Sequence, residues 1–369
     1  MAGPFSRFDR PSGRIIGLAL VTLAMVIAAS FVVVQEANRV RPAIQTQDMF
    51  PDLDTDEAAS LVIRSPSEQV LIVRDEDGDW VVPARGGYPA RPEPLLQTIG
   101  GLEALELLEA KTTRADWHHF LGLEAPDQGG TGVEITLSNA AGGILASIIV
   151  GNQPEGNVVE PDGRARVHVR HSDETQTWLA RGFLSLQTDV TEWLATQLYD
   201  IAPDRIREAR VSLANGESYT LSRSNRLNSN FELLDLPVGR EVLSPFVINA
   251  VGTALSNMEV EDVLREADVD LTGGSEIIYR TFDGLELTLR LASPTGSNPG
   301  WATIFARFTG LPDAEASDAA AVAEEAANVN VLTDGWAFQV PDYKARQMSL
   351  TLGDLLRPNP GEAPSGTEN

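Results

Sequence analysis

The four histidines are the first candidates for metal binding, because neutral imidazole is a common metal ligand. They form two close pairs, His118 with His119 and His168 with His171. Adjacent side chains diverge on a helix or strand, and neither pair lies in the His-Glu-x-x-His pattern that places two ligands on one helix face. The chain has no cysteine that could complete a site. We therefore predict no metal site and no bound cofactor.

An acidic run at residues 75–79 starts like a calcium loop. In an EF-hand loop beginning at Asp75, Gly86 would occupy position 12, where the bidentate glutamate belongs. Gly78 stands at position 4, whereas the invariant glycine belongs at position 6. The run is instead typical of a solvated hairpin turn in which Gly78 takes a positive φ.

Motifs for nucleophilic and phosphoryl chemistry are missing from the sequence. It contains neither the Gly-x-Ser-x-Gly elbow nor Ser-x-x-Lys, and neither Lys111 nor Lys344 follows a phosphate-binding glycine loop, which excludes a P-loop ATPase. The glycine-rich segment 129–132 precedes a strand and does not link a strand to a helix, so it is not a dinucleotide motif. The 53 acidic residues could still supply a glycosidase pair, but we predict no particular catalytic residue.

Residues 15–34 form a run of 20 residues without a charge. A helix of that length is about 30 Å long, which matches the hydrocarbon core of a bilayer. We predict a transmembrane helix here, with residues 1–14 in the cytoplasm because Arg7, Arg10 and Arg14 precede it. A signal peptide cleaved near Ala28 remains an alternative. The retained anchor would place the following body in the periplasm, on the outer side of a bacterial inner membrane.

The predicted span contains small residues at Gly17, Ala24 and Ala28, which fall roughly on one helix face. Small residues let two membrane helices approach closely. This face is therefore a candidate contact with another membrane protein.

The rest of the chain is strongly acidic. The formal net charge is −25, which makes nucleic acid a poor partner, and there is no cysteine for a disulfide framework. No second apolar stretch is long enough to cross the bilayer.

After a polar linker at residues 35–58, short β-branched runs predict a three-stranded meander that ends at residues 80–82. The leucine spacing from residue 92 to 110 then indicates an amphipathic helix, in which Gly100 and Gly101 weaken the helix or let another backbone approach. Further hairpins follow, around residues 139–143 and up to residue 170. This order predicts a first α+β unit at residues 59–203.

From residue 204 the order of elements repeats. A meander ends near Phe231, in the place of Trp80, and a helix at 245–258 matches the helix at 92–110. We therefore predict an α+β protein with two similar units, each an antiparallel sheet covered by one main helix, the second at residues 204–356. The acidic, alanine-rich insert at 312–330 shows no broad apolar stripe and is typical of an exposed helix or a disordered loop, and residues 357–369 read as a disordered tail.

The succession of these motifs resembles a bacterial membrane-anchored family catalogued as domain of unknown function 4340. The motifs that carry the resemblance are Trp80-Val81-Val82-Pro83, Tyr88-Pro89-Ala90, Leu121-Gly122-Leu123 with Pro126, and Thr191-Glu192-Trp193-Leu194 leading to Asp200-Ile201 and Ile206. Members of that family are often encoded beside ABC transporter permeases of the gliding-motility type. The resemblance implies a membrane-anchored extracytoplasmic protein, and it supplies no catalytic residues.

Two functions remain open. The first is a non-enzymatic auxiliary subunit that binds a membrane protein such as an ABC-type permease. The second is a membrane-tethered hydrolase that acts on envelope polysaccharide through a carboxylate pair. We favour the first, because no motif with a catalytic mechanism is present.

Overall fold

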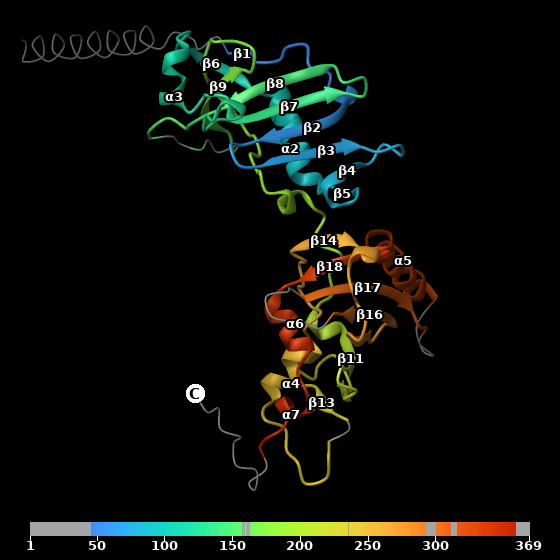
Figure 1. The fold of residues 1–369 in the computed structure, drawn as a ribbon. Coiled ribbons are helices and arrows are strands. Elements are labelled where there is room, and N and C mark those ends of the chain that lie inside the picture. Colours follow the sequence, from blue (N-terminus) through green and yellow to red (C-terminus); the bar gives the residue numbers. More distant parts are fainter. Residues whose placement is uncertain are drawn as a thin grey trace, which may run out of the picture.

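The computed structural model describes residues 46–156, 159, 163–234, 236–292, 300–310 and 316–358 (Figure 1). These residues form two antiparallel sheets with few helices, so the predicted α+β class is confirmed. The predicted span at residues 15–34, with Gly17, Ala24 and Ala28, lies outside the described residues. Within them, no helix has the length and apolar character needed to cross a membrane.

The first sheet runs in the order β1-β6-β10-β9-β8-β7-β2-β3-β4-β5. Its strands are β1 (Gln47–Asp48), β2 (Ala58–Arg64), β3 (Gln69–Arg74), β4 (Trp80–Val82), β5 (Tyr88–Pro89), β6 (Glu106–Ala110), β7 (Val133–Asn139), β8 (Ile144–Val150), β9 (Ala165–His171) and β10 (Trp178–Gly182). Helix α2 (Pro92–Glu103) buries its apolar residues against this sheet, and α3 (His118–Leu121) lies near one end of it (Figure 1).

The second sheet runs in the order β13-β12-β11-β15-β16-β17-β18-β14. Its strands are β11 (Ile206–Ser212), β12 (Ser218–Ser222), β13 (Glu232–Leu233), β14 (Asp262–Arg265), β15 (Ser275–Thr281), β16 (Leu285–Leu291), β17 (Gly300–Phe308) and β18 (Trp336–Val340). Its helices are α4 (Pro245–Gly252), α5 (Ala316–Thr333), α6 (Asp342–Met348) and α7 (Leu352–Leu355).

Both sheets follow the same path through space. Without β1 and β5, the first sheet reads β6-β10-β9-β8-β7-β2-β3-β4, and the second, read from its other end, is β14-β18-β17-β16-β15-β11-β12-β13. Each strand therefore has a counterpart at the same place in both the sheet and the chain, and α2 corresponds to α4. We call β2 to β10 with α2 the first unit, and β11 to β18 with α4 the second unit.

The strand register places Trp80 and Phe231 at corresponding positions, as the sequence predicts. Trp80 lies opposite Arg74 at the start of β4. Phe231 directly precedes β13, and the pairing of β12 with β13 sets it beside Arg223. The guanidinium carbon lies 5.2 Å from the Trp80 ring centroid and 4.6 Å from that of Phe231. The same cation–π contact thus occurs in both units.

The predicted helix at residues 92–110 is too long. Helix α2 ends at Glu103, where the backbone N–H of Ala104 bonds to the carbonyl of Gly100. Leu105 and Leu107 are both buried, with the period of two expected for the strand β6 that follows. The helix predicted at 245–258 likewise ends early, at Gly252. In both cases the apolar residues that follow the helix happen to continue its sequence pattern, although the helix itself has ended.

The acidic insert is neither exposed throughout nor a loop in its described part. Residues 316–333 form α5, which buries Val322, Ala326 and Val329 at helical spacing. Asn330 of α5 accepts a hydrogen bond from the Ala306 N–H and donates one to its carbonyl, each 2.8 Å long. The helix therefore covers the part of β17 that β18 does not reach. The apolar stripe of Val322, Ala326 and Val329 is too narrow to predict from the sequence that this helix packs on the sheet.

Part of the predicted linker belongs to the first sheet. Strand β1 pairs with β6, and Met49 directly after it is buried. The sequence did not predict this contact, because a single buried side chain shows no periodicity.

The two units meet between the β4–α2 loop of the first and β14 with β18 of the second (Figure 1). Arg85 binds Asp262 through two hydrogen bonds of 2.6 and 2.9 Å. The buried Tyr88 ring lies edge-on to Trp336, with 5.0 Å between centroids. Arg265 stacks over Trp336 at 3.8 Å and donates to the Gly86 carbonyl. These contacts combine a charged pair with aromatic packing.

Candidate functional site

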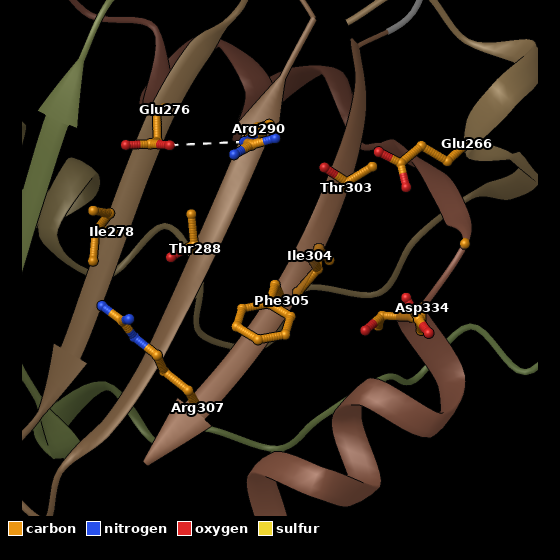
Figure 2. A pocket seen from close by; sticks show the side chains of 12 residues that line it. Glu266, Glu276, Ile278, Thr288, Arg290, Thr303, Ile304, Phe305, Arg307 and Asp334 are labelled. Carbon is orange, nitrogen blue, oxygen red and sulfur yellow. Dashed lines mark ion pairs between the residues drawn. The ribbon is translucent and has the colours of Figure 1, made fainter. Parts of the chain in front are cut away.

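The outer face of the second sheet carries a hollow of about 480 Å³ between β15, β16, β17 and the end of α5. It lies where α5 follows on from β18, because β18 pairs with β17 only over residues 300–302. Figure 2 shows Glu276 across this hollow from Glu266 and Asp334, with Phe305 between them. Three carboxylates thus line one concave surface.

Two arginines balance part of this negative charge. Arg290 lies opposite Glu276 in the β15–β16 pairing, with 3.7 Å between guanidinium and carboxylate (Figure 2). Arg307 lies at the other side of the hollow and binds the fully buried Glu286 with a 2.6 Å hydrogen bond. The hollow is therefore mixed in charge.

Charges alternate directly across four strands beside this hollow. The register places Glu208, Arg280, Glu286 and Arg307 opposite one another in succession. Arg280 donates to Glu208 at 2.8 Å and to Glu286 at 2.7 Å, and its hydrogen bond with Glu286 raises the pKa of Arg280. The Glu286 carboxylate thus accepts hydrogen bonds from two guanidinium groups, which commits it to a structural role.

A second hollow of about 760 Å³ lies on the outer face of the first sheet. Thr136, Ser147 and Ser172 form a chain of hydroxyl groups in it, with oxygen distances of 3.1 and 2.8 Å. Arg64 binds Glu134 at 3.2 Å beside this chain. This chain of hydrogen bonds contains neither a histidine nor a carboxylate, so its hydroxyl groups do not form a catalytic triad.

The hollows lie on corresponding strands of the two units. In the pairing of β2 with β7, the buried Ile135 lies opposite Ile63. In the corresponding pairing of β11 with β15, the buried Ile277 lies opposite Val211. Glu134 and Glu276 therefore occupy one equivalent position, and their hydrogen-bonding surroundings differ. The two units present the same open sheet face with different side chains.

The histidines do not come together into a metal site. His118 lies against the Thr175 carbonyl at 3.0 Å, and His168 against the Asn152 carbonyl at 2.8 Å. His171 packs edge-on to Phe50. Within the described residues there is no group of three or more histidine, aspartate or glutamate side chains that could hold a metal ion.

The acidic run at 75–79 is the predicted hairpin turn. The Asp75 carboxylate accepts hydrogen bonds from the backbone N–H groups of Asp77 and Asp79, and Gly78 has a φ of 90°. The carboxylate is thus committed to the turn.

Carboxylate pKa values bear on acid–base chemistry. Among the described residues, the carboxyl groups whose pKa departs clearly from its ordinary value are Glu106, Asp116, Asp189, Asp270 and Asp283, and each is lowered. Hydrogen bonds cause the shift at the first four, chiefly from Arg181, Arg114, the Thr191 backbone and Thr272. At Asp283 burial raises the pKa, but hydrogen bonds from Thr281 and Arg205 outweigh it.

Sequence reasoning did not single out the residues that line the hollows. Glu276, Arg290 and Arg307 alternate with apolar residues, which indicates that they face outward from a sheet. Which of them lie opposite one another depends on the strand register, and no pattern within one strand contains it.

Residues 80–274, just over half of the 369-residue chain, match the family described as Domain of unknown function (DUF4340). The match starts at Trp80 in β4 and ends directly before β15, so it includes the contact between the units. No curated protein and no solved structure matches the chain.

Proposed function

The chain belongs to the DUF4340 family, and from that premise we propose that it is a membrane-anchored extracytoplasmic protein without enzymatic activity that serves as an auxiliary subunit of an ABC-type transport system. The apolar run at 15–34 supports an anchor with a cytoplasmic N-terminus and a periplasmic body. The open outer faces of both sheets supply surfaces for partner proteins.

The observation that carries the non-catalytic part of the proposal is that Glu286, the buried carboxylate beside the hollow, is bound by two guanidinium groups. A glycosidase needs one carboxylic acid that stays protonated near neutral pH, so its pKa is raised. Each clearly shifted carboxyl group in the described residues is lowered instead. These groups serve ion pairs and turns, which favours contact over catalysis.

A membrane-tethered polysaccharide hydrolase is the second candidate, because Glu266, Glu276 and Asp334 line one hollow. Such an enzyme would lose its activity when a single one of these carboxylates became an amide. We expect Glu276→Gln and Asp334→Asn to leave envelope polysaccharide turnover unchanged. Loss of a measured hydrolysis in either variant would replace the auxiliary function by the enzymatic one.

The anchor itself is part of the proposed contact. Gly17, Ala24 and Ala28 would let a helix of the permease approach closely. A polyleucine span of equal length should keep the protein in the membrane but weaken its co-purification with the permease. Unchanged co-purification would confine the contact to the extracytoplasmic body.

The decisive experiment is purification of the full chain from its native membranes in a mild detergent. We expect an ABC-type permease to elute with the chain in a constant ratio. Protease added to spheroplasts should remove the body and leave a small membrane stub. A body protected until lysis, or a chain that purifies without any transport protein, would contradict the proposal.

A further inference from the structure

The hollow on the second sheet has an uncharged floor. The strand register places Ile278, Thr288 and Phe305 opposite one another across β15, β16 and β17. Phe305 is 55% exposed, and Figure 2 shows its ring in the middle of the hollow. An exposed aromatic ring in a concave surface offers contact to the apolar part of a ligand and to a cation.

The two rows of side chains that flank this floor on the sheet are balanced in charge. One row holds Glu276 and Arg290, one charge of each sign. The other row runs from Glu208 through Arg280 and Glu286 to Arg307, two charges of each sign. The sheet therefore places no net charge beside the floor.

The third side of the hollow, at the end of α5, is negative. Asp334 directly follows α5, and Glu266 directly follows β14. The Glu266 N–H donates to the Gly335 carbonyl at 2.9 Å, which brings Glu266 beside the turn that contains Asp334. Figure 2 shows both side chains on the same side of the hollow, next to β17. Among the described residues, neither carboxylate has an ion pair or a hydrogen bond from another side chain.

Thr333 adds an unused hydrogen-bonding group at this same side. It is the last residue of α5, it lines the hollow, and it is only 3% exposed. A threonine in a helix often bonds to the carbonyl one turn earlier. The Thr333 hydroxyl has no hydrogen-bond partner among the residues that the structure describes. A buried hydroxyl without a partner indicates that a polar group is missing beside it.

We propose that this hollow binds a small organic cation, with its ammonium group between Glu266 and Asp334 and its aliphatic chain over Phe305. An ammonium group has three N–H donors, which match the two carboxylates and the Thr333 hydroxyl. The volume of about 480 Å³ lies in the ordinary range of small-molecule sites. The inference goes beyond the proposed function and does not depend on it, because it requires no partner protein.

The far end of the hollow determines where the ligand carries its charge. Arg290 and Arg307 lie on the two sides of Thr288, and their side chains are 67% and 58% exposed. A second ammonium group at this end would be repelled by these guanidinium groups. The site therefore favours a cation with its positive charge at one end. A metal ion does not fit, because no group of three metal-ligating side chains is present in the described chain.

The test is isothermal titration calorimetry of the purified full chain in mild detergent, with n-butylammonium chloride as the probe and a blank titration into detergent alone. We expect one binding site per chain. Glu266→Gln with Asp334→Asn should weaken binding at least tenfold. The control, Asp52→Asn with Glu232→Gln, removes two exposed negative charges elsewhere and should leave the affinity within twofold.

Two further probes separate a defined site from general attraction to an acidic chain. The neutral 1-butanol should bind at least tenfold more weakly than n-butylammonium, and 1,4-diaminobutane should bind no more tightly than n-butylammonium. Absence of binding, equal losses in the two double variants, or tighter binding of the diamine would overturn the proposal.

Thr333→Val tests the unused hydroxyl. It should weaken binding of n-butylammonium at least threefold. The urea midpoint of the chain without ligand should stay unchanged or rise, because the substitution removes a buried polar group without a partner. A hydroxyl with a structural role would instead lower the midpoint. Unchanged affinity in Thr333→Val would contradict the placement of the ammonium group at this side of the hollow.

Discussion

At the scale of single residues, two neighbouring glycines of α2 have opposite roles. A Cβ atom at Gly101 would overlap the carbonyl oxygen of Phe183, whereas a Cβ atom at Gly100 would meet no atom within 4 Å. The close backbone approach that the sequence allowed for this pair therefore occurs at Gly101. Gly100 contributes only the greater flexibility of glycine in a helix.

We therefore expect Gly101→Ala to lower the free energy of unfolding by about 1–3 kcal/mol, because the segment at Phe183 must move. Gly100→Ala should raise it by up to about 1 kcal/mol, the ordinary gain of alanine over glycine in a helix. Urea unfolding of the full chain in mild detergent, followed by tryptophan fluorescence, measures both. Equal effects of the two substitutions would show that the close approach is absent.

A charged cluster at Glu106 makes stability depend on pH. A hydrogen bond from Arg181 is the main cause that lowers the pKa of Glu106, and Arg164 adds a second contact at 3.1 Å. A lowered folded-state pKa gives stability that is complete above the ordinary value near 4.5 and is lost as the pH falls through the folded-state value.

Glu106→Gln should therefore destabilise the protein at pH 7, and the difference from the unmodified chain should shrink as the pH falls through the lowered pKa of Glu106. Urea midpoints at several pH values between 7 and 3 measure this difference. The exposed Glu103 at the end of α2 serves as the control, and Glu103→Gln should give no such trend. A difference that stayed constant with pH would contradict the assigned role.

At the scale of elements, α5 is an addition to the second unit that shields a sheet edge. The corresponding connection in the first unit, between β9 and β10, contains no helix. Arg205 ties α5 to the sheet, with hydrogen bonds of 2.7 and 2.6 Å to Glu325 and of 2.8 Å to Asp283. The edge of β17 is therefore closed by a side-chain amide and a helix where a strand would otherwise pair.

Removing this amide should expose the edge. Asn330→Ala leaves both the N–H and the carbonyl of Ala306 without their partner, which we expect to cost about 1–3 kcal/mol. Hydrogen exchange of the Ala306 N–H should become faster, and urea unfolding measures the loss in the free energy of unfolding. Asn328→Ala, on an exposed position of the same helix, is the control and should change neither measurement. Unaltered exchange in Asn330→Ala would mean that α5 does not protect β17.

At the scale of the whole molecule, the buried Tyr88 connects the two units. The centroid of its ring lies 5.0 Å from that of Trp336 and 5.9 Å from that of Phe338. Its hydroxyl donates a hydrogen bond to the carbonyl of Ala195, in the segment that connects the two units. One side chain thus contacts both sheets and the chain between them.

Tyr88→Ala should cost about 3–5 kcal/mol, the usual range for removing a buried aromatic ring. It should also make the segment between the units, residues 183–205, more sensitive to limited proteolysis, because the units are held together less firmly. Tyr88→Phe keeps the ring and removes only the hydrogen bond, so it should be much milder. Proteolysis at the same rate in Tyr88→Ala as in the unmodified chain would show that the units are joined elsewhere.

The sequence determined the features that local patterns encode. Alternating apolar residues predicted the strands, Gly78 predicted a tight turn, and the succession of runs predicted the equivalence of Trp80 and Phe231. These succeed because the period of a strand and the φ of a turn depend on neighbouring residues. The acidic composition likewise predicts, whatever the fold, that nucleic acid is a poor partner.

Only the tertiary structure decided where α2 ends, because Leu105 and Leu107 fit a helix and a strand equally well until β6 pairs with β10. It also decided that α5 packs, since its few apolar residues gain from burial only where β17 lies open. Glu276 meets Arg290 through strand register. Each of these depends on contacts between residues far apart in the chain, which local propensity does not carry.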